Sequence, residues 1–154
     1  MIAISSDHAG FQLKQNIISH LKENGIAFTD FGPCDAKSVD FPDYASKVAL
    51  AIMNKHCDQG ILICGTGIGM SIAANKFPGI RAALCTSMFQ ARMSRLHNDA
   101  NILVLAGRVT APDFSIAILK EWLGNAFLGG KYEGRNEKIT NIEESNNGGK
   151  NDGI

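Results

Sequence analysis

A thiol and three alternating glycines stand together in the segment Cys64-Gly65-Thr66-Gly67-Ile68-Gly69. Glycines let backbone N–H groups approach a ligand closely, and the N-terminus of the helix expected to follow attracts an anion. A thiol in that position can act as a thiolate, whereas most free cysteines are small buried hydrophobes. The segment therefore predicts an anion or oxyanion cradle with Cys64 as its candidate base. A tight turn is the simpler alternative.

This loop lacks the features of two common nucleotide-binding motifs. A dinucleotide fingerprint requires glycine where Met70 stands and an acidic residue after the next strand, where the sequence has Cys85-Thr86-Ser87. A P-loop requires Gly-Lys and then Ser or Thr at the start of the helix, and the sequence does not have them there. We therefore expect the loop to hold a small anionic or oxyanionic group.

Further candidates stand after other expected strands. Asp7 and His8 follow the first strand, and Arg108 follows the fifth. With the basic pair Lys131 and Arg135, His8 and Arg108 could hold a phosphate, because charge-assisted hydrogen bonds suit phosphate oxygens. The simpler alternatives are a helix N-cap for Asp7 and solvated surface charge for the basic side chains.

The segment His97-Asn98-Asp99 joins an expected helix to the fifth strand. A histidine at a helix C-terminus is favoured by the helix dipole, so the position also has an ordinary structural explanation. The segment that enters a parallel strand lies at the sheet edge opposite to the one that carries Cys64. If His97 serves the same site, it most simply comes from a second subunit.

The elements that must position these residues alternate between strands and helices. Apolar runs predict strands at 2–6, 26–31, 61–64, 80–85 and 102–106. Amphipathic patterns with Pro, Gly or Asn at their ends predict helices at 11–23, 42–52, from the glycine loop to 74, at 87–97, 112–123 and 135–144. This order predicts an α/β protein with a three-layer αβα Rossmann-like fold, in which helices cover both faces of a five-stranded parallel sheet. Ligands of such sheets bind beyond the carboxyl ends of the strands.

The composition is that of one ordinary globular domain. The chain has 154 residues, 45% of them hydrophobic, and its 15 basic and 15 acidic side chains leave no net charge. That balance argues against a general binder of nucleic acid or anionic membranes. We expect a single domain over 1–144 and a disordered tail over the Asn/Gly-rich stretch 145–154.

The four cysteines form no Cys-x-x-Cys pair, and no His, Cys or carboxylate group has metal-ligand spacing. The N-terminus lacks the pattern of a signal peptide, and no apolar run is long enough to span a membrane. We therefore expect no bound metal, no membrane partner and a reducing, cytoplasmic location.

Five separated stretches occur in an order that resembles one known family. They are SDHAGFQLK at 6–14, ICGTGIGMSIAANK at 63–76 with PGIRAAL after it, RLHNDANIL at 95–103, Gly107-Arg108, and WLG at 122–124. Over residues 1–144 the chain resembles the ribose-5-phosphate isomerase B group of sugar-phosphate isomerases. The resemblance implies a cofactor-free aldose–ketose isomerase that forms a homodimer or a dimer of dimers, with sites shared between subunits.

The resemblance also implies roles for the glycine loop. Cys64 matches the base that moves a proton between C1 and C2 of the sugar. Thr66 matches a group that holds the enediolate oxygens, together with the loop amides of Gly65, Gly67, Ile68 and Gly69. Such an isomerisation needs a base near the carbon acid, a polarised carbonyl and an anion clamp, which agrees with the reading of the residues themselves.

Other residues match the remaining parts of that site. His97 matches the residue that opens the furanose ring, and Asn98 matches a ligand of a sugar hydroxyl. Asp7 matches a catalytic residue that contacts the substrate, and His8 matches another substrate contact. The phosphate-binding positions of the family fall on His8, Arg108, Lys131 and Arg135.

Two positions depart from the family pattern. Many relatives carry arginine where Lys131 stands, and lysine lacks the bidentate fork of arginine. Many carry tyrosine where Phe41 stands, so one hydroxyl contact to the sugar is missing here. Ribose 5-phosphate is the expected substrate. The alternatives are a hexose 6-phosphate, such as that of allose or galactose, and a non-catalytic phosphosugar-binding module, against which the presence of Cys64 counts.

Overall fold

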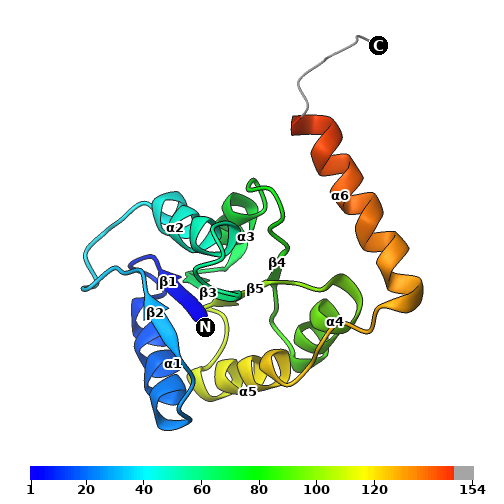
Figure 1. Ribbon diagram of the computed structural model, residues 1–154. Helices are drawn as coiled ribbons and strands as arrows, with labels where there is room; N and C mark the ends of the chain where they lie inside the picture. Colours follow the sequence, from blue (N-terminus) through cyan, green and yellow to red (C-terminus); the bar gives the residue numbers. More distant parts are fainter. Residues whose placement is uncertain (148–154) are drawn as a thin grey trace.

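A five-stranded parallel sheet forms the centre of the computed structural model, which describes residues 1–147 (Figure 1). Its strands are β1 (Ile2–Ser6), β2 (Phe28–Asp30), β3 (Gln59–Cys64), β4 (Ala82–Leu84) and β5 (Ile102–Ala106), in the order β2-β1-β3-β5-β4. The three central strands are almost wholly buried, as expected of continuous apolar runs. All neighbouring pairs are parallel, so the carboxyl ends of β1, β3 and β5 meet at one edge.

Helices cover both faces of this sheet, which confirms the predicted three-layer αβα Rossmann-like fold. The helices α1 (Phe11–Glu23), α4 (Met88–Asn98) and α5 (Pro112–Leu123) lie on one face, and α2 (Phe41–Met53) and α3 (Ile68–Ala74) lie on the other (Figure 1). Each face has its own apolar core. Leu13 and Ile17 of α1 pack in the first core, and Val48 and Ala49 of α2 pack in the second.

The two outer strands are shorter than predicted. The sequence predicts strands at 26–31 and 80–85, and the sheet uses Phe28–Asp30 and Ala82–Leu84. Each outer strand has one neighbour only, β1 for β2 and β5 for β4, so a ladder on a single side determines its length. Apolar residues beyond that ladder, such as Ile26 and Ile80, pack against the two cores without joining the sheet.

The amide side chain of Asn75 pairs with the outer strand β4. Its Nδ2 donates to the carbonyl oxygen of Ala82 at 2.8 Å, and its Oδ1 accepts from the Ala82 N–H at 2.8 Å. The same Nδ2 also donates to the carbonyl oxygen of Ser71 at 2.9 Å, which ties the side chain to α3. One side chain therefore satisfies both backbone groups of Ala82.

The last helix stands away from the rest of the molecule (Figure 1). The 3₁₀ turn η1 (Gly130–Tyr132) leads directly into α6 (Glu133–Asn147), where the sequence predicts a helix at 135–144. The helix continues to Asn147, beyond the predicted end at 144, and the rest of the expected tail, 148–154, lies outside the described residues. The helix α6 starts earlier than predicted, because η1 already turns the chain into a helical path at Glu133.

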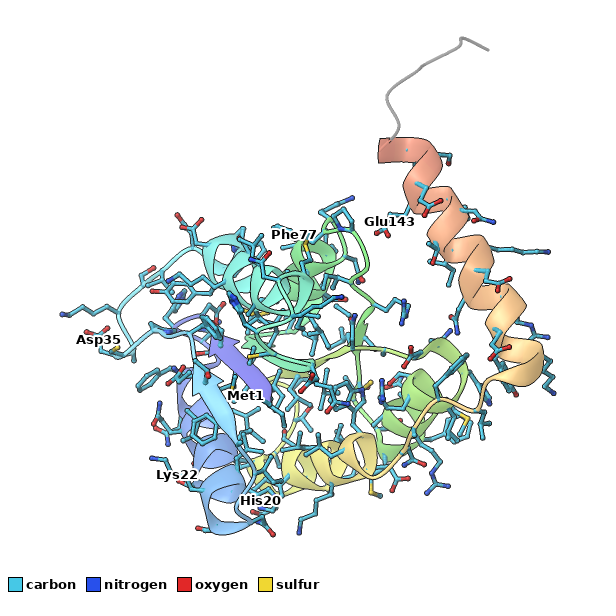
Figure 2. All side chains as sticks on the ribbon, viewed as in Figure 1. Met1, His20, Lys22, Asp35, Phe77 and Glu143 are labelled. Carbon is cyan, nitrogen blue, oxygen red and sulfur yellow. The ribbon has the colours of Figure 1, made fainter. Side chains whose placement is uncertain are left out.

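Two hydrogen bonds attach α6 to the body of the protein. Asn136 Nδ2 donates to the carbonyl oxygen of His97 at 3.1 Å, and Glu143 Oε2 accepts from the Gly79 N–H at 2.8 Å. Figure 2 shows Glu143 on the side of α6 that faces the turn after α3, where Phe77 is also labelled. Within 1–147, the structure contains no helix with the length and apolar character that crossing a bilayer requires.

Candidate active site

The predicted glycine loop follows β3 at the carboxyl edge of the sheet. Cys64 is the last residue of β3, and its Sγ accepts a hydrogen bond from the Gly67 N–H at 3.1 Å. Gly67 has φ of 77°, and a Cβ built there would lie 3.3 Å from the Leu105 carbonyl oxygen, so the backbone favours glycine. The thiol is therefore held against the backbone at the start of α3, with Thr66 exposed beside it.

Asp7 and His8 form a second wall of this site. The Asp7 N–H donates to the carbonyl oxygen of Ile63 at 3.0 Å, which places the turn after β1 beside the end of β3. The buried Asp7 carboxylate accepts from the Gly10 N–H at 2.8 Å, so it also caps the turn into α1. His8 is half-buried, and its Nδ1 accepts from the Val39 N–H at 3.4 Å.

Arg108 forms a third wall. Its N–H donates to the carbonyl oxygen of Gly65 at 2.9 Å, so the loop after β5 runs against the glycine loop. A Cβ built on Gly65 would lie 3.4 Å from Arg108 Cδ and 3.5 Å from Ala9 Cβ. The Arg108 side chain and the turn after β1 thus pack on the same residue of the loop, which leaves the exposed Arg108 guanidinium at this edge.

Phe41 closes the loop on the side of α2. A Cβ built on Gly69 would lie 2.9 Å from two carbons of the Phe41 ring, so the ring packs directly on this glycine. The sequence identifies Phe41 only through its departure from a family pattern, and the structure places it in contact with the loop.

The structure brings together five predicted side chains at this edge, as expected: Cys64, Thr66, Asp7, His8 and Arg108. The same group includes the backbone of Gly65, Gly67, Ile68 and Gly69.

Three of the four remaining predicted residues form a second cluster, and Asn98 follows one of them, His97, in the chain. The imidazole of His97 stacks on the ring of Tyr132, with centroids 4.1 Å apart and planes 13° from parallel. Lys131 Nζ lies 5.2 Å and Arg135 Cζ 5.5 Å from the centroid of the same ring. Sequence reasoning missed Tyr132. The available signal was an aromatic residue between two basic residues directly after Gly129-Gly130.

The two clusters lie at opposite edges of the sheet in one chain. Cys64 pairs with Ala106 at the carboxyl end of β5, whereas His97 precedes the amino end of β5. Five residues of β5, at about 3.3 Å each, separate the two edges. Asn98 is exposed and lines a hollow of about 650 Å³ between β4 and α6. One chain therefore does not bring His97, Asn98, Lys131 or Arg135 to Cys64.

The other cysteines have different surroundings. Burial raises the pKa of the Cys85 thiol from 9.0 to about 11, and burial also raises that of Cys57. Cys34 is exposed on the loop before α2. Only Cys64 lies at the end of a central strand beside a glycine loop. Among residues 1–147, no group of three or more His, Cys, Asp or Glu side chains is placed to hold a metal ion.

Comparison with known proteins identifies the family. A profile described as Ribose/Galactose Isomerase matches residues 2–139. The chain belongs to this family. It is 47% identical over 146 residues to Ribose-5-phosphate isomerase B of Escherichia coli strain K12, covering 95% of this chain and 98% of the relative. The resemblance seen in the sequence is thereby confirmed.

Solved structures of the family have the same fold. Ribose-5-Phosphate Isomerase B of Clostridium thermocellum has a TM-score of 0.93 at 52% identity, covering 94% of this chain and 98% of that one. Ribose-5-phosphate Isomerase B from Mycoplasma genitalium with bound Ribulose-5-phosphate has a TM-score of 0.88 at 41% identity, covering 93% and 95%. Family membership, fold and motif order thus agree over nearly the whole chain.

Proposed function

We propose that the chain interconverts D-ribose 5-phosphate and D-ribulose 5-phosphate through an enediolate. The observation that carries the proposal is the Cys64 thiol, held by the Gly67 amide between Asp7–His8 and Arg108. The names of the relatives support this substrate, and one solved relative is described with ribulose 5-phosphate bound. Free thiols at all four cysteines agree with a cytoplasmic location.

Cys64 acts as the base in this proposal. As a thiolate it removes the proton from C2 of the open-chain aldose and returns it to C1, while a hydroxyl proton passes from O2 to O1. The loop amides and Thr66 donate hydrogen bonds to the oxygens on which negative charge develops. His8 and Arg108 supply donors for the phosphate at the same edge.

A second copy of the chain completes the site. His97 opens the furanose ring, and a two-fold contact would bring it, with Asn98, Lys131 and Arg135, to the Cys64 edge of the partner. Such an isologous contact creates two identical sites. The support is the separation of the two clusters within one chain, since Arg135 lies with His97 around the Tyr132 ring and not at the Cys64 edge. We propose a homodimer, alone or paired into a dimer of dimers.

The test of the base is a pair of measurements on Cys64→Ala. One is conversion of ribose 5-phosphate. The other is exchange of the C1 hydrogen of ribulose 5-phosphate with D2O, which needs proton abstraction without ring opening. Both are expected to fall by at least about a hundredfold, because a missing general base costs that much. Cys34→Ala, at an exposed cysteine, is the matched control and should change neither rate.

Exchange that persists in Cys64→Ala would remove the cysteine from the mechanism. Substrate choice is tested in the wild-type chain by kcat/KM for ribose 5-phosphate, allose 6-phosphate and galactose 6-phosphate. A preference for a hexose phosphate would leave the proposed mechanism unchanged but would make a hexose 6-phosphate the substrate. Phe41 would then be the first residue to replace. Binding of these compounds with no turnover would favour the non-catalytic module.

A further inference from the structure

The cluster around His97 is organised by one aromatic ring. Tyr132 is half-buried in η1, and its ring contacts three basic side chains: the His97 imidazole, Lys131 and Arg135. These are three of the four side chains that the proposed function takes from the second subunit. The proposed function assigns no role to Tyr132 itself.

Other contacts fix the backbone at His97 and leave its ring to Tyr132. The His97 carbonyl oxygen accepts from Asn136, and Asp99 ends α4 in the left-handed conformation with φ of 46°. The Asp99 carboxylate pairs with Arg81 at 2.8 Å and with Arg95 at 3.1 Å. These contacts hold the main chain on both sides of the imidazole, whereas the stack against Tyr132 determines the plane of the imidazole.

The same ring offsets the crowding of positive charge. Lys131 and Arg135 both lie within 6 Å of the Tyr132 centroid, where the face of an aromatic ring attracts cations. Both are exposed and, within the described residues, neither takes part in an ion pair with a carboxylate. The ring therefore gathers the two cations beside the imidazole before any phosphate is present.

We propose that Tyr132 is a positioning residue, which orients His97 for ring opening and holds Lys131 and Arg135 ready for the phosphate. The proposal rests on the proposed function. It requires the aromatic face and not the phenolic hydroxyl, since the stack and both cation contacts involve the ring. Phenylalanine should therefore replace tyrosine, and an aliphatic side chain of similar bulk should not.

The test compares Tyr132→Phe and Tyr132→Leu in the full chain. Ring opening is followed as conversion of furanose ribose 5-phosphate in a single turnover, and proton transfer as C1 exchange of saturating ribulose 5-phosphate in D2O. In Tyr132→Leu we expect conversion to fall at least about tenfold, because a misplaced His97 loses part of the contribution that a positioned acid–base group makes. Exchange should stay within about twofold of the wild-type rate. KM should rise in that variant. Tyr132→Phe should keep both rates within about twofold.

Tyr44→Leu is the matched control. Tyr44 lies on α2, and its ring also makes a cation–π contact, with Lys47 Nζ 4.2 Å from the ring centroid. This variant loses an aromatic ring and a cation contact on the face of the sheet opposite to α4, so conversion and exchange should keep their wild-type ratio.

Two results would overturn the proposal. In one, conversion and exchange fall in equal proportion in Tyr132→Leu, which would mark a merely structural role. In the other, Tyr132→Phe is as impaired as Tyr132→Leu, which would show that the phenolic hydroxyl and not the ring face is required. Failure of the proposed function is distinguishable from both, because the Cys64→Ala variant would then retain conversion and exchange.

Discussion

The four cysteines differ in their surroundings. Cys64 ends a central strand and meets an amide, whereas Cys85 lies in the apolar core and Cys34 lies on an exposed loop. A sequence places Cys64 before a glycine loop, but it does not show which N–H reaches the sulfur. Asp7 illustrates the same limit. Its carboxylate accepts from the Gly10 N–H, so it closes the turn before α1 and is not the N-cap of that helix, which is Gly10. Its place in the site stays a prediction.

Cys85 makes a pH dependence of stability testable. Its pKa is raised to about 11 from 9.0. Below pH 9 both states hold the proton. Between pH 9 and 11 the unfolded chain releases it while the folded chain keeps it, so the free energy of unfolding falls by up to about 2 kcal/mol.

The measurement is urea denaturation at several pH values for wild type, Cys85→Ala and Cys34→Ala. The difference between wild type and Cys85→Ala should shrink from pH 9 to 11, and that between wild type and Cys34→Ala should stay constant. A parallel pair of curves for wild type and Cys85→Ala would contradict the buried-thiol assignment.

At the scale of elements, local signals predict most of the fold. An asparagine follows the end of α1, and a proline begins α5. Both helices have the predicted limits, Phe11–Glu23 and Pro112–Leu123. Lys14 shows what local signals miss. It is wholly buried, and its ammonium donates to both Asp30 oxygens at 2.8 and 3.0 Å and to the Pro33 carbonyl oxygen at 2.6 Å. Those partners come from β2 and the loop after it, so only the tertiary structure reveals why a lysine is inside.

The turn between β1 and α1 has no room for a side chain at Gly10. A Cβ there would lie 2.3 Å from the backbone oxygen of Ile63, which cannot move without disturbing β3. We expect Gly10→Ala to lower the free energy of unfolding by about 3 kcal/mol or more, since the clash is with backbone.

Chemical denaturation followed by circular dichroism measures this loss. Gly79→Ala is the control, because Gly79 has φ of 74° and no atom within 4 Å of a built Cβ. It should cost about 1 kcal/mol through backbone strain alone. Equal costs at the two glycines would show that the turn after β1 is not closely packed on β3.

At the scale of the whole molecule, the predicted site is divided between the two edges of the sheet, with Cys64 at one edge and His97 at the other. The strand order and the α6 geometry could not be read from the sequence, because both depend on contacts between distant segments. The sequence nonetheless indicates the separation, since His97 precedes a strand and Cys64 ends one. The proposed dimer would pair each of these groups with the other group of a second copy.

Mixing two inactive variants tests this arrangement. Cys64→Ala and His97→Asn each spoil a different half, so a mixed dimer has one intact site and one doubly altered site. After unfolding and refolding together in equal amounts, the mixture should regain about a quarter of wild-type activity, because half of the dimers are mixed and each has one working site. Activity no higher than that of the separate variants would place both residues in one chain's site.

The Asn75 contact with β4 has a consequence for solubility. An outer strand with free N–H and C=O groups is a template on which another chain can add a strand, and this is how folded sheets begin to aggregate. Asn75→Ala should therefore raise light scattering on prolonged incubation at equal folded fraction, while Asn24→Ala, at the exposed end of α1, should not. With Asn75 in place, both backbone groups of Ala82 are already occupied. The side chain therefore blocks the addition of a sixth strand at Ala82.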